Sequence, residues 1–420
     1  MNLYAIAAVI LGISALASVF NTRVLRLPDT IGLMATGLLA SLALLTFGTV
    51  FPEIIRPLCH QVLEFDFSGF VLDFALGFLI FTGAFTADAE AMERDRWPIL
   101  TFATVGILLS TFLVGGLTYG IVSILGLNVP FVHCLLFGAL ISPTDPIAVL
   151  AILKETAVPR SLQADIAGES LLNDGVAVVV FLTIMQLAGG GGHGDAETHT
   201  SVLSVVTLFG REVLGGAVLG AAFAWLGVRL VRLARVPAVD VLLSLAMVMA
   251  CYATAVILHV SGALALVVAG VIFGVALRGP KVSAHERQHL EFFWEAIDHI
   301  LNAVLFTLMG LVLLGLSASF QWTYLIAGIM AVPAVLLARL LSVSLPLPLT
   351  KLRCGNVRTT IVLLTWGGLR GGISIALALS LDEPLSRDLI LHMTYVVVAA
   401  SILGQGLTIS PLVKKLIPNP

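Results

Sequence analysis

Long apolar stretches follow one another along the whole chain, with short polar segments between them. A helix needs roughly 20 apolar residues to cross the hydrocarbon of a bilayer, and the stretches recur at that length. They do not alternate apolar and polar residues, as the strands of a transmembrane barrel do. The pattern therefore predicts an all-helical polytopic membrane protein with a single transmembrane domain over residues 1–420. About thirteen spans are expected, at 2–20, 29–50, 69–87, 98–125, 129–153, 166–188, 204–228, 237–258, 260–277, 297–317, 322–348, 359–381 and 389–411.

Composition agrees with this pattern. Hydrophobic residues make up 59% of the chain and charged residues 11%, against the roughly 25% charged residues of an average soluble domain. Mean hydropathy is +1.06. No polar region is long enough to form a soluble domain, and the net charge of −3 is spread over the loops, so we expect no nucleic-acid partner.

Basic residues predict how the spans are oriented. Under the expected map, seventeen Lys and Arg residues lie in the odd-numbered loops and the C-terminus, and three lie in the even-numbered loops. Cytoplasmic loops are enriched in Lys and Arg, so the N-terminus is expected outside and the C-terminus in the cytoplasm of a cell (inner) membrane. The first span begins almost at Met1, with Arg23 and Arg26 behind it, which is unlike a cleavable signal peptide.

Ionisable residues also lie inside three of the spans. An ionisable group at the bilayer centre costs about 2.5–3.5 kcal/mol on insertion scales, so such residues are functional candidates. The motifs are Ser142-Pro143-Thr144-Asp145-Pro146 in span five, Gly168-Glu169-Ser170-Leu171-Leu172-Asn173-Asp174-Gly175 in span six, and Gly367-Gly368-Leu369-Arg370-Gly371-Gly372 in span twelve.

Asp145 and Asp174 are expected at similar depth. Asp145 precedes the cytoplasmic end of span five, near Lys154, and Asp174 follows the cytoplasmic end of span six, near Ile166. At about 1.5 Å per residue, both carboxylates lie about 12 Å from the cytoplasmic boundary. They can therefore share one site near the midplane.

Helical spacing sorts the polar groups of span six. Residues four apart share a face, so Ser170 stacks with Asp174, and Glu169 stacks with Asn173. The first face offers a hydroxyl and a carboxylate, which suit a hard cation that prefers oxygen ligands. The second face holds Glu169, which needs a positive partner, and we expect Arg370 in that role.

Two spans are expected to be interrupted helices. Pro143 and Pro146 each remove a backbone donor beside Asp145, and the glycines around Arg370 make that turn permissive. Interrupted helices expose carbonyl groups and helix ends, which ion-coupled transporters use to hold ions near the midplane. Spans five and twelve run in opposite directions, as an inverted repeat predicts.

Other polar residues have plainer interpretations. Arg339 in span eleven is expected to pack against carbonyl groups or a carboxylate, and Asp73 to reach headgroups near the outer end of span three. The series Glu295, Asp298 and Asn302 is expected to cap the cytoplasmic start of span ten. The loop 189–200, with its two histidines, is interpreted as a flexible tether rather than a metal site.

At this point the residues support a family resemblance over essentially the whole chain. The segments SPTDPIAVL (142–150), GESLLNDGVAVVV (168–180), WGGLRGGISIALALSL (366–381) and FWEAIDHILNAVLF (293–306) resemble the NhaP-like sodium/proton exchangers of the monovalent cation:proton antiporter superfamily. The resemblance implies a thirteen-helix fold, a homodimer and a core of inverted six-helix repeats with two broken crossing helices, spans five and twelve.

The resemblance also implies roles for particular residues. Asp174 would carry the cation or the proton, with Asn173 before it, and Ser170 would help to ligate the ion. Thr144 and Asp145 would lie where the broken helices cross, and Glu169 would pair with Arg370. Exchangers with an Asn-Asp pair resemble the electroneutral, one-for-one type.

One position departs from the family pattern. Many relatives carry an acidic residue in the third span where this chain has Thr82. The Thr82 hydroxyl could still ligate an ion, but one negative charge is missing, and Asp73 lies too far along the helix to replace it. Ion affinity and the choice of cation are therefore open.

The predicted function is secondary antiport. Asp174 takes either H⁺ or a cation such as Na⁺ or Li⁺, with Ser170 and Thr144 as further cation ligands, and K⁺/H⁺ exchange is the alternative with the same site. No ATP-binding motif is present, so an ion gradient is the expected driving force, with no enzymatic activity and no cofactor. An intramembrane aspartyl protease would also use two membrane aspartates, but no Gly-x-Gly-Asp sequence surrounds either one. A cation channel, the other alternative, would show flux without counter-transport of H⁺.

Overall fold

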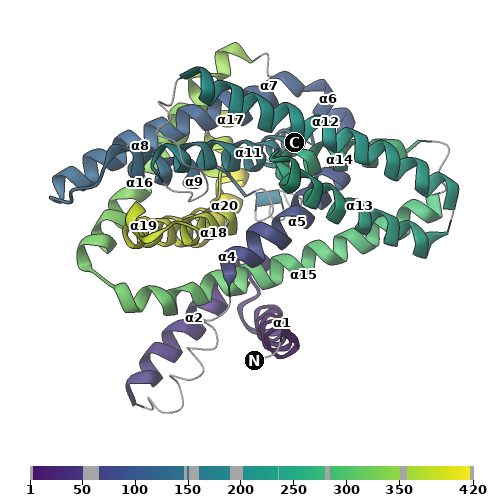
Figure 1. Ribbon diagram of the computed structural model, residues 1–420. Coiled ribbons are helices and arrows are strands. Elements are labelled where there is room, and N and C mark those ends of the chain that lie inside the picture. Colours follow the sequence, from purple (N-terminus) through teal and green to yellow (C-terminus); the bar gives the residue numbers. More distant parts are fainter. Residues whose placement is uncertain are drawn as a thin grey trace.

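The computed structural model describes residues 3–50, 66–145, 149–150, 160–189, 202–234, 236–279, 284–350 and 357–416 (Figure 1). All regular structure within these ranges is helical, which confirms the predicted fold class. Pro146 and the histidines of the 190–200 loop lie outside the described residues.

Ten helical segments of the described chain are long and apolar enough to cross a membrane, and three shorter apolar helices accompany them. The exact number of spans therefore stays a prediction. The α-helices, with their bounds, are α1 (Leu3–Phe20), α2 (Asp29–Val50), α4 (Phe67–Gly69), α5 (Leu76–Thr86), α6 (Ala89–Arg94), α7 (Arg96–Thr101), α8 (Ile107–Ile124), α9 (Phe131–Ile141), α11 (Arg160–Leu187), α12 (Val202–Ala234), α13 (Pro237–Leu258), α14 (Gly262–Leu277), α15 (Ala284–Leu316), α16 (Trp322–Ser344), α17 (Val357–Trp366), α18 (Gly372–Leu379), α19 (Arg387–Ala399) and α20 (Gly406–Leu416).

Several spans are continued through π-helical turns rather than built from one uniform α-helix. These turns are η1 (Asn21–Leu25), η2 (Phe70–Ala75), η3 (Phe102–Gly106) and η7 (Ala400–Gln405). As a result α4, η2 and α5 form one span, α7, η3 and α8 another, and α19, η7 and α20 the last. Such turns are rare and occur frequently at functional sites.

Helical structure stops at two places where the sequence predicts breaks. Helix α9 ends at Ile141, and residues 142–145 are not helical. Helix α17 ends at Trp366, and α18 begins only at Gly372. With about 1.5 Å of rise per residue, neither α9 nor α17 is long enough to cross about 30 Å of hydrocarbon. Each carries the chain only part of the way and leaves helix ends inside the protein.

Helix α15 runs past most of the molecule, with α1 and α2 on one side of it and most of the other helices on the other (Figure 1). It approaches α2 very closely at Gly37 and Gly310: a Cβ atom added to Gly310 would lie 2.6 Å from the Cα atom of Gly37. Close backbone approach of this kind between membrane helices depends on small residues at the contact.

The start of α15 corrects one expectation. Span ten was expected at 297–317 with Glu295, Asp298 and Asn302 as an interfacial cap, but the helix begins at Ala284. These side chains therefore project from the interior of a long helix. Apolar residues mark only the part of a helix that meets lipid or protein core, so the polar first turns of α15 look like a loop in the sequence.

Buried apolar residues form two clusters. The larger one includes side chains of α2, α8, α9, α11, α16, α18 and α19, and the smaller one those of α5, α12, α13 and α14. Helix α15 contributes to both, with Trp294 in the smaller cluster and Phe306 in the larger one.

Candidate functional site

The non-helical segment that follows α9 contacts the unwound segment between α17 and α18. The backbone N–H of Asp145 donates to the carbonyl oxygen of Leu369 at 2.8 Å. A Cβ atom on Gly371 would lie 2.7 Å from a carboxylate oxygen of Asp145, and one on Gly368 would lie 3.2 Å from Cγ2 of Thr144. A side chain at either position would crowd these neighbours, which gives the glycine-rich motif a packing reason as well as a conformational one.

A charged side chain lies at a helix end on each side of this contact. The guanidinium of Arg370, 2% exposed, donates to the carbonyl oxygens of Ser142 and, at 2.9 Å, Pro143, which follow the last turn of α9. The Asp145 carboxylate lies against Gly371, the residue that caps the start of α18. Both placements suit the helix dipole, which favours cations at C-termini and anions at N-termini.

Helix α11 approaches the break of α9 with two polar side chains. Asn173 donates from Nδ2 to the Thr144 hydroxyl at 2.8 Å, and that hydroxyl lies 3.0 Å from the hydroxyl of Ser170. The backbone N–H of Thr144 points to Oδ1 of Asn173 at 3.4 Å. Thr144 therefore links two residues that the helical spacing had assigned to different faces.

The ion pair of Glu169 corrects a predicted partner. Glu169 lies 2.7 Å from Nη1 of Arg339, and both side chains are buried. No ion pair in the described part of the chain joins Glu169 to Arg370, whose guanidinium is directed to carbonyl groups instead. Arg339 also donates from Nε to the carbonyl oxygen of Leu364 at 3.3 Å, so it contacts both kinds of group expected for it.

A cavity of about 1030 Å³ reaches this region. Asp174, Asp145, Thr144 and Thr82 all line it, so the structure brings the two predicted carboxylates to one space. The Asp174 side chain is at the edge of burial, with the residue 9% exposed. The remaining polar wall of the cavity comes from residues near the basic loops, among them Arg26, Asp29, Asp88, Gln163 and Glu295.

Two other predicted residues differ in their relation to this cavity. Thr82 lines it, although its hydroxyl donates to the carbonyl oxygen of Phe78 on its own helix at 2.8 Å. Asp73 is exposed in η2 and does not line the cavity. The structure therefore separates Asp73 from the other candidates.

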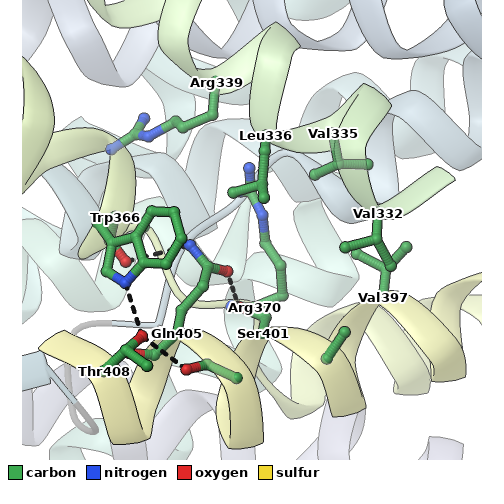
Figure 2. A pocket seen from close by; sticks show the side chains of 13 residues that line it. Val332, Val335, Leu336, Arg339, Trp366, Arg370, Val397, Ser401, Gln405 and Thr408 are labelled. Atoms are coloured by element: carbon green, nitrogen blue, oxygen red, sulfur yellow. Dashed lines mark hydrogen bonds between the residues drawn. The ribbon is translucent and has the colours of Figure 1, made fainter. Parts of the chain in front are cut away.

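A smaller cavity of about 270 Å³ lies behind the break of α17 and α18, and Figure 2 shows the side chains that line it. Ser401 accepts from the backbone N–H of Arg370 at 3.1 Å and donates to Oε1 of Gln405 at 2.7 Å. Gln405 donates in turn to the carbonyl oxygen of Trp366 at 3.1 Å. Ser401 and Gln405, both in η7, therefore hold the unwound segment between α17 and α18. In the sequence they could have been found as polar residues within the apolar last span.

The arrangement can hold one small positive species among oxygen atoms. Asp174 supplies a carboxylate and Thr144 a hydroxyl group to the large cavity. Ser170 does not line the cavity, but its hydroxyl group lies 3.0 Å from that of Thr144. Carboxylate, hydroxyl and carbonyl oxygens are the ligands that hard cations prefer. A carboxylate in that position can alternatively take a proton.

Comparison with known proteins gives a consistent result. The family model described as "Sodium/hydrogen exchanger, transmembrane" matches residues 9–415. The chain is 44% identical to the Na⁺/H⁺ antiporter NhaP of Pseudomonas aeruginosa over 98% of this chain and 96% of that protein. It is 30% identical to the Na⁺/H⁺ antiporter NhaH of Halobacillus dabanensis over 94% and 93% of the two chains.

A solved structure shows a similar fold. The sodium proton antiporter MjNhaP1 of Methanocaldococcus jannaschii, determined at pH 8, matches with a TM-score of 0.77 over 100% of both chains, at 18% sequence identity.

Proposed function

Since this chain belongs to the sodium/hydrogen exchanger family, we propose that it is a secondary antiporter that exchanges Na⁺ or Li⁺ for H⁺ across the cell membrane. The names of its relatives support the reaction class, since both NhaP and NhaH are described as Na⁺/H⁺ antiporters. The protein is accordingly a transporter rather than an enzyme and uses no cofactor.

One observation carries the proposal most directly: Asp174 lies in the same cavity as Thr144 and Asp145, where the two interrupted helices meet. Residues next to the basic loops line the same cavity, so the cavity connects the Asp174 carboxylate with that end of the molecule. Buried membrane carboxylates that line a water-accessible space are typical of ion pathways.

In the proposed mechanism Asp174 binds either the cation or the proton, and never both. Thr144 and Ser170 supply hydroxyl oxygens to the cation, and Asn173 holds Thr144 through the hydrogen bond from Nδ2. Asn173 is neutral, so the exchanged charge resides on Asp174 alone. One positive charge then leaves the site for each one that enters, and exchange is electroneutral.

The other charged residues near the site hold its framework. Arg370 satisfies the carbonyl groups that follow α9, and Asp145 lies at the start of α18. The ion pair of Glu169 with Arg339 joins α11 to α16. These contacts stabilise the unwound segments without adding a second titratable carrier.

We further propose that the protein is a homodimer in the inner membrane, with the N-terminus outside and the C-terminus in the cytoplasm. In that orientation the large cavity opens to the cytoplasm, because residues next to the basic loops line it. Movement of the core helices against a dimerisation scaffold would then present Asp174 to the other side.

The test uses purified protein in liposomes with an imposed ΔpH. Addition of Na⁺ or Li⁺ is expected to collapse the ΔpH for the wild-type protein and not for Asp174→Asn, which keeps the shape of the side chain and removes its charge. Exchange at wild-type rate in Asp174→Asn would contradict the assignment of the carrier.

Two further arms of the same assay define the reaction. K⁺ in place of Na⁺ tests the alternative K⁺/H⁺ exchange with the same site. Valinomycin with K⁺ on both sides clamps the membrane potential: an electroneutral exchanger keeps its rate, whereas an electrogenic one is accelerated.

A further inference from the structure

Three buried polar side chains line the large cavity but have no hydrogen-bond partner in the described part of the protein. They are Asn302, with both amide atoms unpartnered, and the hydroxyl groups of Thr30 and Ser374. The residues are 6%, 5% and 1% exposed, respectively. A buried polar group without a partner destabilises the fold, so three of them on one cavity require an explanation.

The three side chains come from different helices at neighbouring levels. Gly37 of α2 packs on Thr307 of α15, and Ser41, one turn later, donates to the carbonyl oxygen of Gly310, so the two helices run in parallel. Counting back along both helices from Gly37 and Thr307 brings Thr30 and Asn302 to about the same level.

Ser374 lies on the side of these two residues that is nearer to the break. Gly372 packs against the side chain of Leu305, so the first turn of α18 lies about one turn beyond Asn302 along α15. Gly371, at the start of the same turn, contacts Asp145. The three unpartnered side chains therefore lie within about one helical turn of one another in level, around the same cavity.

Charge on the same wall indicates the sign of the ligand. Glu295 and Asp298 also line the cavity, and their spacing along α15 places them on the face of Asn302, two turns and one turn before it, respectively. The smaller cavity is lined by positive instead of negative side chains, those of Arg339 and Arg370 (Figure 2). A cation is thus favoured at Asn302 and disfavoured behind the break.

We propose that Asn302 and Thr30, with Ser374 beyond them, form a second binding position for a partly hydrated monovalent cation, between the mouth of the cavity and Asp174. The amide oxygen of Asn302 and the hydroxyl oxygen of Thr30 replace part of the water shell, and remaining waters complete it. This second position adds a cation-binding step to the proposed antiport, and the proposal rests on that function. The position also supplies oxygen ligands to a cation that approaches Asp174 through this cavity, where Thr82 contributes no negative charge.

The test separates this position from Asp174. In detergent, the rise in unfolding temperature caused by NaCl, relative to choline chloride of equal ionic strength, reports cation binding to the folded protein. The rise is expected to persist in Asp174→Asn and to be mostly lost in Asp174→Asn/Asn302→Leu. In the otherwise wild-type protein, Asn302→Leu is expected to raise the apparent KM for Na⁺ in the ΔpH assay roughly fivefold to tenfold, as loss of one neutral ligand implies.

Thr118→Val is the matched control. Thr118 on α8 is also buried with an unpartnered hydroxyl, but it lines neither cavity, so its removal is expected to change neither the Na⁺-dependent stabilisation nor the KM. If Asn302→Leu does not fold, Thr30→Val replaces it with the same expectations.

Two results would overturn the second position. One is loss of all Na⁺-dependent stabilisation in Asp174→Asn alone, and the other is an unchanged KM in the folded Asn302 or Thr30 variant. Either result leaves the proposed antiport intact as long as the wild-type protein exchanges Na⁺ for H⁺. Absence of that exchange in the wild-type protein would count against the proposed function instead.

Discussion

Individual charged residues in the spans were recognisable from the sequence, because an ionisable group inside an apolar helix is costly and therefore conspicuous. Asp145, Asp174, Glu169 and Arg370 all lie at or next to the meeting point of the interrupted helices. The partner of Glu169 was not predictable in the same way. Helical spacing shows which residues share a face, but it does not show which of two arginines on other helices packs against it.

Thr144 is expected to be sensitive to loss of its hydroxyl, because that one group contacts both Ser170 and Asn173. Thr144→Val keeps the shape and leaves two buried partners without a contact, so the apparent KM for Na⁺ should rise by about tenfold or more. Thr144→Ser retains the hydroxyl and should stay within about twofold of the wild type. Measurement of ΔpH collapse against Na⁺ concentration distinguishes them, and equal KM values for the two variants would refute the role of the hydroxyl.

The pair of Glu169 and Arg339 is expected to behave as a unit. Breaking a buried ion pair by removing one partner costs about 3–5 kcal/mol, because the other charge is left uncompensated. Glu169→Ala and Arg339→Ala should therefore each lower stability strongly, and the double variant should be less destabilised than the two effects added together. Thermal unfolding in detergent measures all three variants, and strict additivity would show that the two side chains do not interact.

At the scale of helices, the breaks were predictable because proline and glycine have local effects that do not depend on the rest of the fold. The start of α15 was not, because its first turns are polar and mostly exposed, so they lack the apolar residues that mark a span. Asn302 and Ser374 were missed as ligand candidates for a related reason. Neutral polar residues are common in membrane helices, and only the structure shows that these two lack partners.

The close approach of α2 and α15 makes Gly310 intolerant of a side chain. A Cβ atom there would lie 2.6 Å from the backbone of Gly37, so Gly310→Ala must push the helices apart. We expect a loss of about 1–3 kcal/mol, as overpacking typically costs. Gly116→Ala on α8 is the control, because no atom lies within 4 Å of its added Cβ. Equal unfolding temperatures for the two variants would show that the contact is not tight.

At the scale of the whole molecule, the large cavity is lined by residues of both apolar clusters, such as Leu76 and Leu171 from the smaller one and Leu33 and Leu305 from the larger one. A site lined by residues of two packed clusters can change its exposure when the helices around it shift, which alternating access requires. The sequence predicts the helices but not this division, because it depends on contacts between distant residues. The inverted repeat and the homodimer stay predictions.

The central claim is that cation and proton compete for the single carboxylate of Asp174. The most direct test is the apparent KM for Na⁺ of the wild-type protein in liposomes, measured at a series of pH values. Each unit of pH decrease raises the concentration of the competing proton tenfold. Competition therefore predicts that the KM for Na⁺ rises by about tenfold per unit wherever the proton is the main occupant of Asp174. The maximal rate should change little. A KM that is independent of pH, with a maximal rate that falls as the pH falls, would contradict the shared site.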